Sequence, residues 1–365
     1  MYFKELVGQR QIAEKLRHSF LNQKLGHALL LVGHEGYGAL PLVLALARYM
    51  VCRNPQPDDA CGTCPACKKM DKLIHPDIHF VFPVINKKGK ESISDSFIDE
   101  WRDFVKESPY SSYSQWIKYI ATENKQGGIF KDESDQISRK VNLKSYEAEC
   151  KIVIIWSADK MNESASNKLL KILEEPPEKT HFFLLSAHPE KMLQTILSRT
   201  QIINVPPITI EEIERFLIQN KSIPSENAHD LALFSEGNLE SAIDFIERRE
   251  EFEQNTRDFY AFIQNAKQQK YADLLAFIDG DLAKNRNRQI EFLQYSLHII
   301  RQRFLSGQNN SSSPTNSSFD INQTISFSQA QQLYQLFQKA IVHIERNVNS
   351  RIVLLDTAIQ LRKIL

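Results

Sequence analysis

A glycine-rich turn after an apolar run is the feature that most constrains the fold of this chain. Ala28–Val32 is entirely apolar, and Gly33-His-Glu-Gly36-Tyr-Gly38 follows it directly. This order is typical of a phosphate-binding loop, which joins a buried strand to a helix and cradles phosphates with backbone N–H groups. Ala39 and Leu40 stand where such a loop has a phosphate-binding lysine and a Mg²⁺-binding hydroxyl. We expect a vestigial loop (Gly33, Gly36, Gly38, Ala39, Leu40) that does not bind ATP, although another kind of tight strand-to-helix turn has the same glycines.

Apolar runs alternate with helical periodicity up to about residue 206, which predicts a parallel sheet covered by helices. Each run is short and nearly all apolar, as strands buried on both faces should be. The expected strands are Ala28–Val32, Ile78–Phe82, Ile152–Trp156, Phe182–Ser186 and Ile202–Val205.

The end of the third expected strand lacks the acidic pair of an active ATPase. Trp156 and Ser157 occupy the two positions, and an indole offers no oxygen ligand to Mg²⁺. Asp159 is expected to cap a helix N-terminus rather than to act as a catalytic acid.

An aromatic segment lies between the second and third expected strands. Within Ser92–Tyr119, Phe97, Trp101, Phe104 and Val105 recur at helical spacing. We expect a helix that covers the sheet, rather than an aromatic binding surface.

Charge and hydropathy exclude some classes of protein. Lys+Arg and Asp+Glu are 45 each, so no overall charge draws the chain to nucleic acid or to a membrane. No segment approaches the roughly 18 apolar residues of a membrane span. We expect a cytoplasmic protein.

Four of the five cysteines are clustered as C-x8-C-x2-C-x2-C, at Cys52, Cys61, Cys64 and Cys67. Four thiolates can close a tetrahedral structural Zn²⁺ site, with no open position for water. An iron–sulfur cluster is the alternative, although its usual spacings differ. Cys150 precedes an apolar run and is expected to be a buried small residue.

Pro206-Pro207 marks the end of the predicted sheet region, and the pattern after it predicts helices. Thr209 and Glu212 have the form of a capping box and predict a helix start. Every apolar segment after about residue 252 has helical spacing, and Ile352, Leu355 and Ile359 share one helix face. The polar stretch 306–318 has too little apolar surface to fold and is expected to be a mobile loop.

A Ser198-Arg199 dipeptide lies just before the last expected strand. The guanidinium of an arginine presents a fork of donors that fits phosphate oxygens. Arg199 could therefore stabilise charge on the nucleotide of a neighbouring subunit.

Together, His75-Pro-Asp77, the cysteine spacing, Asn167–Pro177 and Ile196–Arg199 resemble the AAA+ clamp-loader ATPase family of bacterial DNA polymerase III, over roughly residues 5–245. The chain looks like the members that lack the loop lysine and do not hydrolyse ATP. The resemblance implies that Arg199 is an arginine finger acting in trans, with Ser198 as its motif partner, and that the four cysteines bind structural Zn²⁺. Thr200 and Glu240 depart from the family, which usually has cysteine at the first position and, in its motor subunits, arginine at the second.

The resemblance also implies the architecture and the partners. An α/β AAA+ P-loop-type domain over 1–206, with the zinc element 52–67 inserted, would precede a helical lid over 207–251 and an all-α collar over 252–365. The partners would be gamma or tau motor subunits and a delta subunit in a five-membered ring, which acts on a sliding clamp and primed DNA without a membrane. The chain would then be no enzyme by itself.

Three alternatives stay open at this point. The chain could be an active ATPase motor of the same family, but Lys160 and Lys168 lie in the wrong segment to replace the loop lysine. It could bind nucleotide without hydrolysis through the backbone of the turn. It could also be a free-standing zinc-dependent nucleic-acid-binding protein, against which the balanced charge counts.

Overall fold

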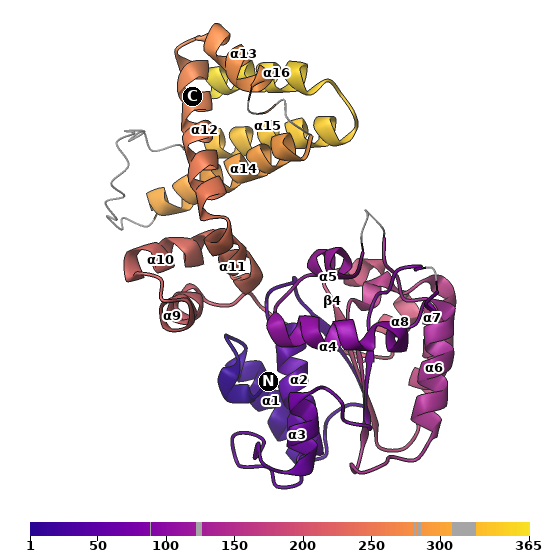
Figure 1. The fold of residues 1–365 in the computed structure, drawn as a ribbon. Helices are drawn as coiled ribbons and strands as arrows, with labels where there is room; N and C mark the ends of the chain where they lie inside the picture. Colours follow the sequence, from indigo (N-terminus) through magenta and orange to yellow (C-terminus); the bar gives the residue numbers. More distant parts are fainter. Residues whose placement is uncertain (88, 122–125, 281, 283–285, 309–325) are drawn as a thin grey trace. The chain divides into compact units, whose positions relative to one another are not determined.

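The chain forms two compact units, Met1–Ile243 and Asp244–Leu365 (Figure 1). The computed structural model describes residues 1–87, 89–121, 126–280, 282, 286–308 and 326–365. The expected division into three domains, at 206/207 and 251/252, stays a prediction.

The first unit is built on one sheet of five parallel strands in the order β2-β3-β4-β1-β5. β1 pairs with both β4 and β5, so the strand that leads into the glycine-rich turn lies inside the sheet. The sheet confirms the expected α/β class, and each strand lies within two residues of its predicted bounds. The strands are β1 (Ala28–Val32), β2 (Ile78–Val81), β3 (Lys151–Ile155), β4 (Thr180–Ser186) and β5 (Gln201–Asn204).

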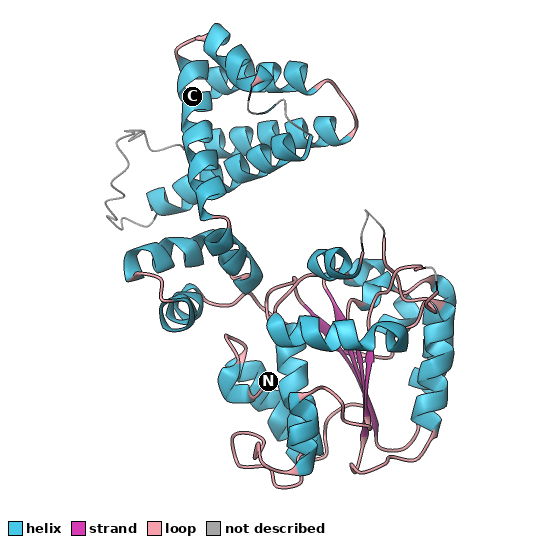
Figure 2. Cartoon of the chain, viewed as in Figure 1, coloured by secondary structure: helices cyan, strands magenta, loops and turns pink. Residues whose placement is uncertain are grey.

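Helices cover both faces of this sheet (Figure 2). Alternate residues of β1 face opposite cores, because side chains of a strand alternate in direction. Leu29 and Leu31 join the core that contains α2 and α4, whereas Leu30 joins the core that contains α6 and α7. The helices up to β5 are α1 (Arg10–Leu21), α2 (Ala39–Val51), α3 (Pro65–Asp71), α4 (Ile98–Glu107), α5 (Tyr113–Ile120), α6 (Lys131–Asn142), α7 (Glu163–Glu174) and α8 (Gln194–Leu197), with 3₁₀ turns η1 (Phe3–Glu5), η2 (Ser94–Phe97), η3 (Ala158–Lys160) and η4 (Pro189–Lys191).

The aromatic segment Ser92–Tyr119 folds as two helices, not as the single helix expected from its spacing. α4 ends at Glu107, and the stretch with Pro109 separates it from α5. Trp101 stacks on Phe82 with ring centroids 4.3 Å apart, and both rings are fully buried. The segment therefore covers the sheet, as predicted, but a loop that the helical pattern did not show projects between its helices.

Three helices follow β5 along the chain. They are α9 (Ile210–Lys221), α10 (Ser225–Phe234) and α11 (Leu239–Glu247). The predicted cap at Thr209 is confirmed, since its Oγ1 accepts the N–H of Glu212 at 3.3 Å.

The second unit is helical throughout its described residues. Its core includes Phe262, Phe292, Phe337 and Leu354, all fully buried. Ile352 and Ile359 share one face of the last helix, as predicted, but that face is exposed, at 63% and 43%. The helices are α12 (Arg249–Lys267), α13 (Tyr271–Asp279), α14 (Arg286–Gln308), α15 (Phe327–Glu345) and α16 (Ser350–Ile364).

The polar stretch 306–318, expected to be a loop, begins inside a helix. Residues 306–308 belong to α14, and residues 309–318 lie outside the described residues. None of the described helices combines the length and the apolar character needed to cross a lipid bilayer.

Candidate functional site

The glycine-rich turn joins β1 to α2 and needs glycine at two of its positions. Gly36 and Gly38 have φ of 80° and 93°, in the left-handed region that glycine adopts without strain. The first residue of α2 is Ala39, and Leu40 is only 5% exposed and packs into the core of the sheet. The side chain of neither residue can offer phosphate or Mg²⁺ a charged or polar group.

The space in front of this turn is almost filled. The cavity there measures about 40 Å³, which is room for only a few water molecules. Pockets that hold small-molecule ligands are usually about 300–1,000 Å³. Its walls are the turn, the start of α2, residues 109–111, and residues at the carboxyl ends of β3 and β4.

Tyr110 is one of three residues of the aromatic segment that line the cavity. Its hydroxyl accepts the N–H of Val7 at 2.8 Å and donates to the carbonyl oxygen of Val7 at 3.3 Å. Its ring lies directly against Gly38, where an added Cβ would come within 3.0 Å of the ring. Burial raises the pKa of Tyr110 to about 12, so the hydroxyl stays protonated and can make both hydrogen bonds.

The turn itself also binds the aromatic segment. Glu35, between the first and second glycines, accepts the N–H of Tyr113 at 3.0 Å. Burial raises the pKa of Glu35 above its ordinary value, against the opposing effect of that hydrogen bond. A carboxylate at this point of the turn would repel a phosphate group.

The first residue of α11 and the residue before it also contact the turn. The N–H of Leu239 donates to the carbonyl oxygen of Gly36 at 3.2 Å. A Cβ on Gly36 would lie 1.8 Å from Oδ1 of Asn238, so only glycine permits this approach. Glu240 lies in the first turn of α11. It stands at the position where the resemblance implies an arginine in motor subunits.

The end of β3 carries no free acidic pair among its described residues. Trp156 and Ser157 follow the strand, and both are buried. Asp159 accepts the hydroxyl proton of Ser186 at 3.0 Å and pairs with Lys160 at 3.1 Å. The expectation that Asp159 caps a helix is wrong, because Asn162 caps α7 by accepting the N–H of Ala165 at 2.8 Å.

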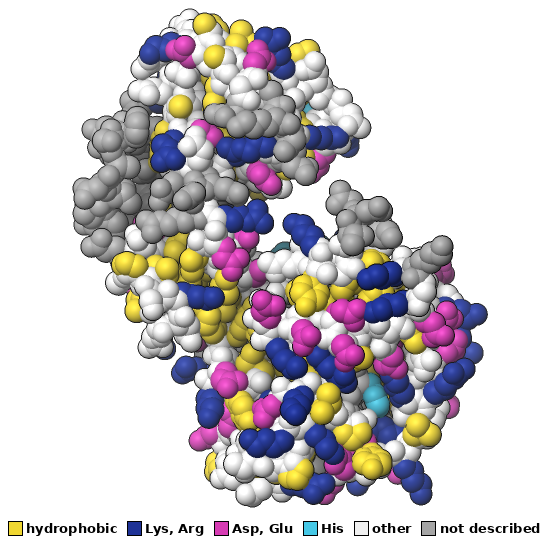
Figure 3. All heavy atoms as spheres, in the orientation of Figure 1, with side chains coloured by type: hydrophobic (Ala, Val, Ile, Leu, Met, Phe, Trp, Pro, Cys, Tyr) yellow, Lys and Arg dark blue, Asp and Glu magenta, His cyan; other side chains and the backbone are white. Residues whose placement is uncertain are grey.

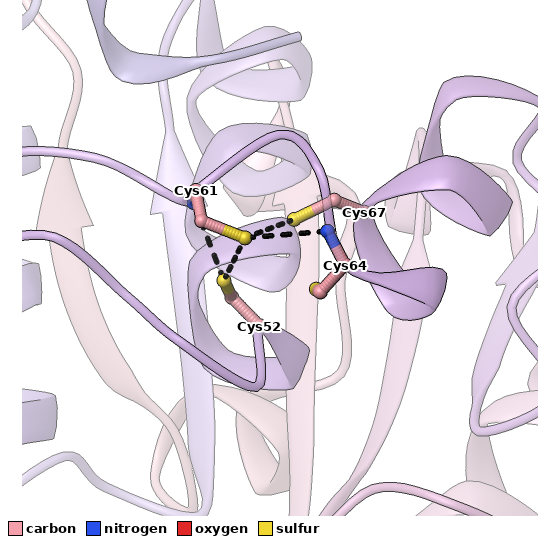
Figure 4. Close-up of side chains that lie close together, drawn as sticks. All are labelled: Cys52, Cys61, Cys64 and Cys67. Carbon is pink, nitrogen blue, oxygen red and sulfur yellow. Dashed lines mark hydrogen bonds between the residues drawn. The ribbon is translucent and has the colours of Figure 1, made fainter.

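The four clustered cysteines converge on one point (Figure 4). Their sulfur atoms all lie within 4.8 Å of one another. The Sγ of Cys61 is 3.5 Å from that of Cys52 and 4.0 Å from that of Cys67. A tetrahedral Zn²⁺ site with Zn–S bonds of about 2.3 Å has sulfur atoms about 3.8 Å apart. The geometry therefore fits four thiolates around one such ion.

Backbone N–H groups favour the thiolate form of Cys61, whereas burial raises the pKa of Cys52 and of Cys67. The N–H of Cys64 donates to Sγ of Cys61 at 3.4 Å, and the N–H of Cys61 donates to Sγ of Cys52 at 3.3 Å. Donation from the N–H groups of Cys64 and Thr63 lowers the pKa of Cys61 to about 6. The thiolate is the form that binds a metal. Cys150 is buried outside the cluster, as predicted.

An arginine anchors the cysteine element to the rest of the first unit. Arg48 of α2 is 1% exposed, and its Nη1 is 2.7 Å from Oδ1 of Asp71 at the end of α3. The same nitrogen donates to the carbonyl oxygen of Cys67 at 3.3 Å. The guanidinium lies 4.0 Å from the centre of the Tyr2 ring. A buried cation thus fixes the helix that carries the last cysteine.

The His75-Pro-Asp77 motif holds the loop before β3. Asp77 is 3% exposed, and its carboxylate accepts the N–H groups of Tyr146, Glu147 and Ala148 at 2.5–2.8 Å. Glu147 in turn pairs with Lys69 of α3 at 2.7 Å. The motif therefore links the cysteine element to the sheet, and it has no contact with the cavity at the turn.

Arg199 lies on the surface in the turn between α8 and β5. Its side chain is 38% exposed, and its Nη2 pairs with Oε1 of Glu174 at 2.6 Å. Its Nη1 donates to the carbonyl oxygen of Thr195 at 3.2 Å and lies 3.4 Å from Oγ of Ser198. Arg199 does not line the cavity at the turn, so the structure does not bring it to the chain's own phosphate-loop residues.

Sequence reasoning missed Tyr110, Glu174 and Asn238. Tyr110 reaches residues far away along the chain, and periodicity carries no information on such contacts. Pro109 is the one local signal, because proline interrupts a helix and so marks a loop within the aromatic segment.

Comparison with known proteins agrees with the family that the motifs indicate. The family described as "DNA polymerase III, delta subunit" matches residues 8–209. The DNA polymerase III subunit delta' of Escherichia coli is 30% identical over 194 residues, which are 53% of this chain and 46% of that protein. The delta' subunit of Bacillus subtilis is 28% identical over 219 residues, 59% of this chain and 53% of that protein.

Related subunits and a solved structure are more distant. The tau subunit of B. subtilis is 27% identical over 238 residues, 65% of this chain and 34% of that protein. A gamma-subunit-related protein from Thermotoga maritima aligns at a TM-score of 0.43 and 15% identity, over 96% of this chain and 98% of that one. The chain spans about half the length of the delta' relatives that it matches. On the match to residues 8–209 and on these relatives, the chain belongs to the delta-prime family of DNA polymerase III subunits.

Proposed function

We propose that this chain is a non-hydrolysing delta-prime subunit of a clamp loader, which helps load a sliding clamp onto primed DNA. One observation carries the proposal. The chain's own glycine-rich turn lacks the lysine and faces a cavity of only about 40 Å³, whereas the guanidinium of Arg199 lies on the surface. The chain then contributes to ATP hydrolysis in trans, on nucleotide held by a neighbouring motor subunit.

The chemistry of Arg199 suits this role. Its planar fork of N–H donors can bind two phosphate oxygens and offset the negative charge that develops during phosphoryl transfer. Its present partner, Glu174, is 47% exposed. Exposed ion pairs contribute only about 0–1 kcal/mol, so the phosphate of a bound nucleotide can replace the carboxylate at little cost. Ser198 supports the turn, since its Oγ donates to the carbonyl oxygen of Thr195 at 3.0 Å.

A structural Zn²⁺ ion held by Cys52, Cys61, Cys64 and Cys67 is the second part of the proposal. The fit of the four sulfur atoms to a tetrahedron supports it. Four protein ligands leave no position for water, so the ion would hold the element together without taking part in a reaction.

The partners follow from the family. Matches to tau and gamma subunits support motor subunits of this kind as neighbours, together with a delta subunit in a five-membered ring. The helices from residue 252 onward would form the collar that holds the ring, and residues 207–251 the lid. Contact with the clamp and with primed DNA would come through the assembled complex.

The alternatives fit the chain less well. An ATPase motor needs an open pocket, a lysine in the turn and an acidic pair after β3. The described lining of this cavity contains no lysine, and Trp156 and Ser157 stand where the acidic pair would be. A free-standing nucleic-acid-binding protein would be expected to gather its basic side chains in a patch. On the face drawn in Figure 3, Lys and Arg are interspersed with Asp and Glu.

Replacing Arg199 in the reconstituted complex tests this proposal. The chain is mixed with its cognate motor subunits, delta subunit, clamp and primed DNA, and ATP turnover is measured. We expect Arg199→Ala to lower ATP turnover by the complex at least tenfold. The melting temperature of the variant chain should equal that of the wild type, because the side chain of Arg199 is exposed. Arg139→Ala is the matched control, since Arg139 follows a serine too, is exposed, and lies on α6. Equal turnover with Arg199→Ala and Arg139→Ala would refute the role in trans.

A further inference from the structure

We infer that the loop between α4 and α5 is a built-in occupant of the nucleotide pocket, with Tyr110 as its anchor. The missing lysine is then one of two barriers to nucleotide, and the second is a segment of the chain itself. This inference rests on the proposed function, and it adds an explanation of how the chain excludes nucleotide from this pocket.

The first line of support is the pairing of Tyr110 with Val7. The phenol hydroxyl of Tyr110 accepts from the N–H and donates to the C=O of this one residue. Tyrosine is suited to this because its hydroxyl is both a donor and an acceptor. The pairing ties the loop, which lines the cavity, to the N-terminal segment.

The second line of support is the way the loop follows the turn. Tyr110 packs on Gly38, and three residues later the backbone N–H of Tyr113 binds Glu35. Ser111 and Ser112, between them, are 8% and 6% exposed. The turn thus contacts an aromatic ring and a backbone donor of its own chain on the side that faces the cavity.

The third line of support is that both flanks of the loop are fixed. Before the loop, Trp101 is buried against Phe82. After the loop, Nε1 of Trp116 donates to the carbonyl oxygen of Pro83 at 2.7 Å, and the ring is fully buried. The helices on both sides of the loop are therefore held in the core, which fixes the two ends of the loop.

Restoring the lysine separates the two barriers. Binding of MgADP to the isolated full-length chain is measured by calorimetry for Ala39→Lys, for Ala39→Lys with Tyr110→Ala, and for Ala39→Lys with Tyr119→Ala. Tyr119 is the matched control, because it lies in the same segment but is 49% exposed and does not line the cavity. We expect at least tenfold tighter binding when Tyr110 is removed, and no such gain when Tyr119 is removed.

Two results would overturn the inference. One is MgADP binding by Ala39→Lys alone that equals binding by the Ala39→Lys, Tyr110→Ala variant. The other is no binding by that double variant although its near-ultraviolet circular dichroism matches the wild type.

Should the double variant fail to fold, the single variant Tyr110→Phe tests whether Tyr110 anchors the loop, because it keeps the ring but loses both hydrogen bonds to Val7. The amide of Val7 should then exchange its hydrogen at least tenfold faster, and an unchanged rate would refute the anchor.

These outcomes are distinct from those that test the proposed function. MgADP binding by the isolated chain reports on the loop, whereas turnover by the assembled complex reports on Arg199. Failure of one leaves the other standing.

Discussion

Two buried carboxylates, Asp77 and Glu133, show how single residues hold the first unit together. Burial acts to raise the pKa of both carboxyl groups. At Asp77, hydrogen bonds from three backbone N–H groups outweigh burial, and the pKa is lowered overall. At Glu133 burial prevails and raises the pKa to about 7, despite donation from the N–H of Ser94. Ser94 belongs to the segment that carries Tyr110, and its Oγ accepts the N–H of Phe82 at 3.0 Å.

The raised pKa of Glu133 predicts a pH-dependent cost. Between its ordinary value of 4.5 and about 7, the folded chain keeps a proton that the unfolded chain has lost. The free energy of unfolding therefore falls as pH rises through this window, by up to about 1.4 kcal/mol per pH unit, and levels off above it. Glu133→Gln removes the titration and keeps an acceptor for Ser94. We expect the variant to gain about 1–3 kcal/mol over the wild type between pH 5 and pH 8.

Urea unfolding of both proteins at several pH values measures this difference. Glu133→Ala is the control, since it removes the charge and also the acceptor for Ser94, and it should destabilise the chain at both ends of the window. A constant difference between Glu133→Gln and wild type from pH 5 to pH 8 would show that the carboxyl does not titrate there.

At the scale of elements, the cysteine element depends on bonds other than hydrophobic contacts. Its buried apolar cluster consists of Cys52, Ala60 and Cys67, packed against Tyr2 and the remaining two cysteines. A structural Zn²⁺ site supplies on the order of 10 kcal/mol of apparent binding free energy, which suits so small a core.

Removing one ligand tests that dependence. We expect Cys64→Ser to lose the bound zinc that the wild type retains, and to expose the backbone of residues 52–71 to hydrogen exchange. Cys150→Ser is the control, because it removes a buried thiol outside the cluster. Metal content by mass spectrometry and exchange rates measure both effects. Zinc retained in full by Cys64→Ser would contradict a four-ligand site.

The elements that could be predicted from the sequence are those with local signals. The five strands are nearly continuous apolar runs, and the cysteines converge because their spacing is short. The helix cap at Asn162 was missed, since Asp159 three residues earlier is an equally good capping residue by type. The loop at Tyr110 could not be placed, because its contacts with Val7 and Gly38 join distant parts of the chain.

At the scale of the whole molecule, the chain combines a sheet-based unit with a helical unit that has its own core. The proposed lack of ATPase activity rests on several separate features: Ala39 and Leu40 in the turn, Trp156 and Ser157 after β3, and Tyr110 in the lining of the cavity. Under the proposal, Arg199 acts only when a neighbouring subunit holds ATP.

The most direct test of this account is ATP turnover by the purified chain alone, before any partner is added. We expect release of phosphate to stay at the rate of the buffer with Mg²⁺ and ATP in millimolar excess, and to rise only in the assembled complex with Arg199 present. Turnover by the isolated wild-type chain, with the same rate in Arg199→Ala, would contradict the account and would show that the chain is itself a motor.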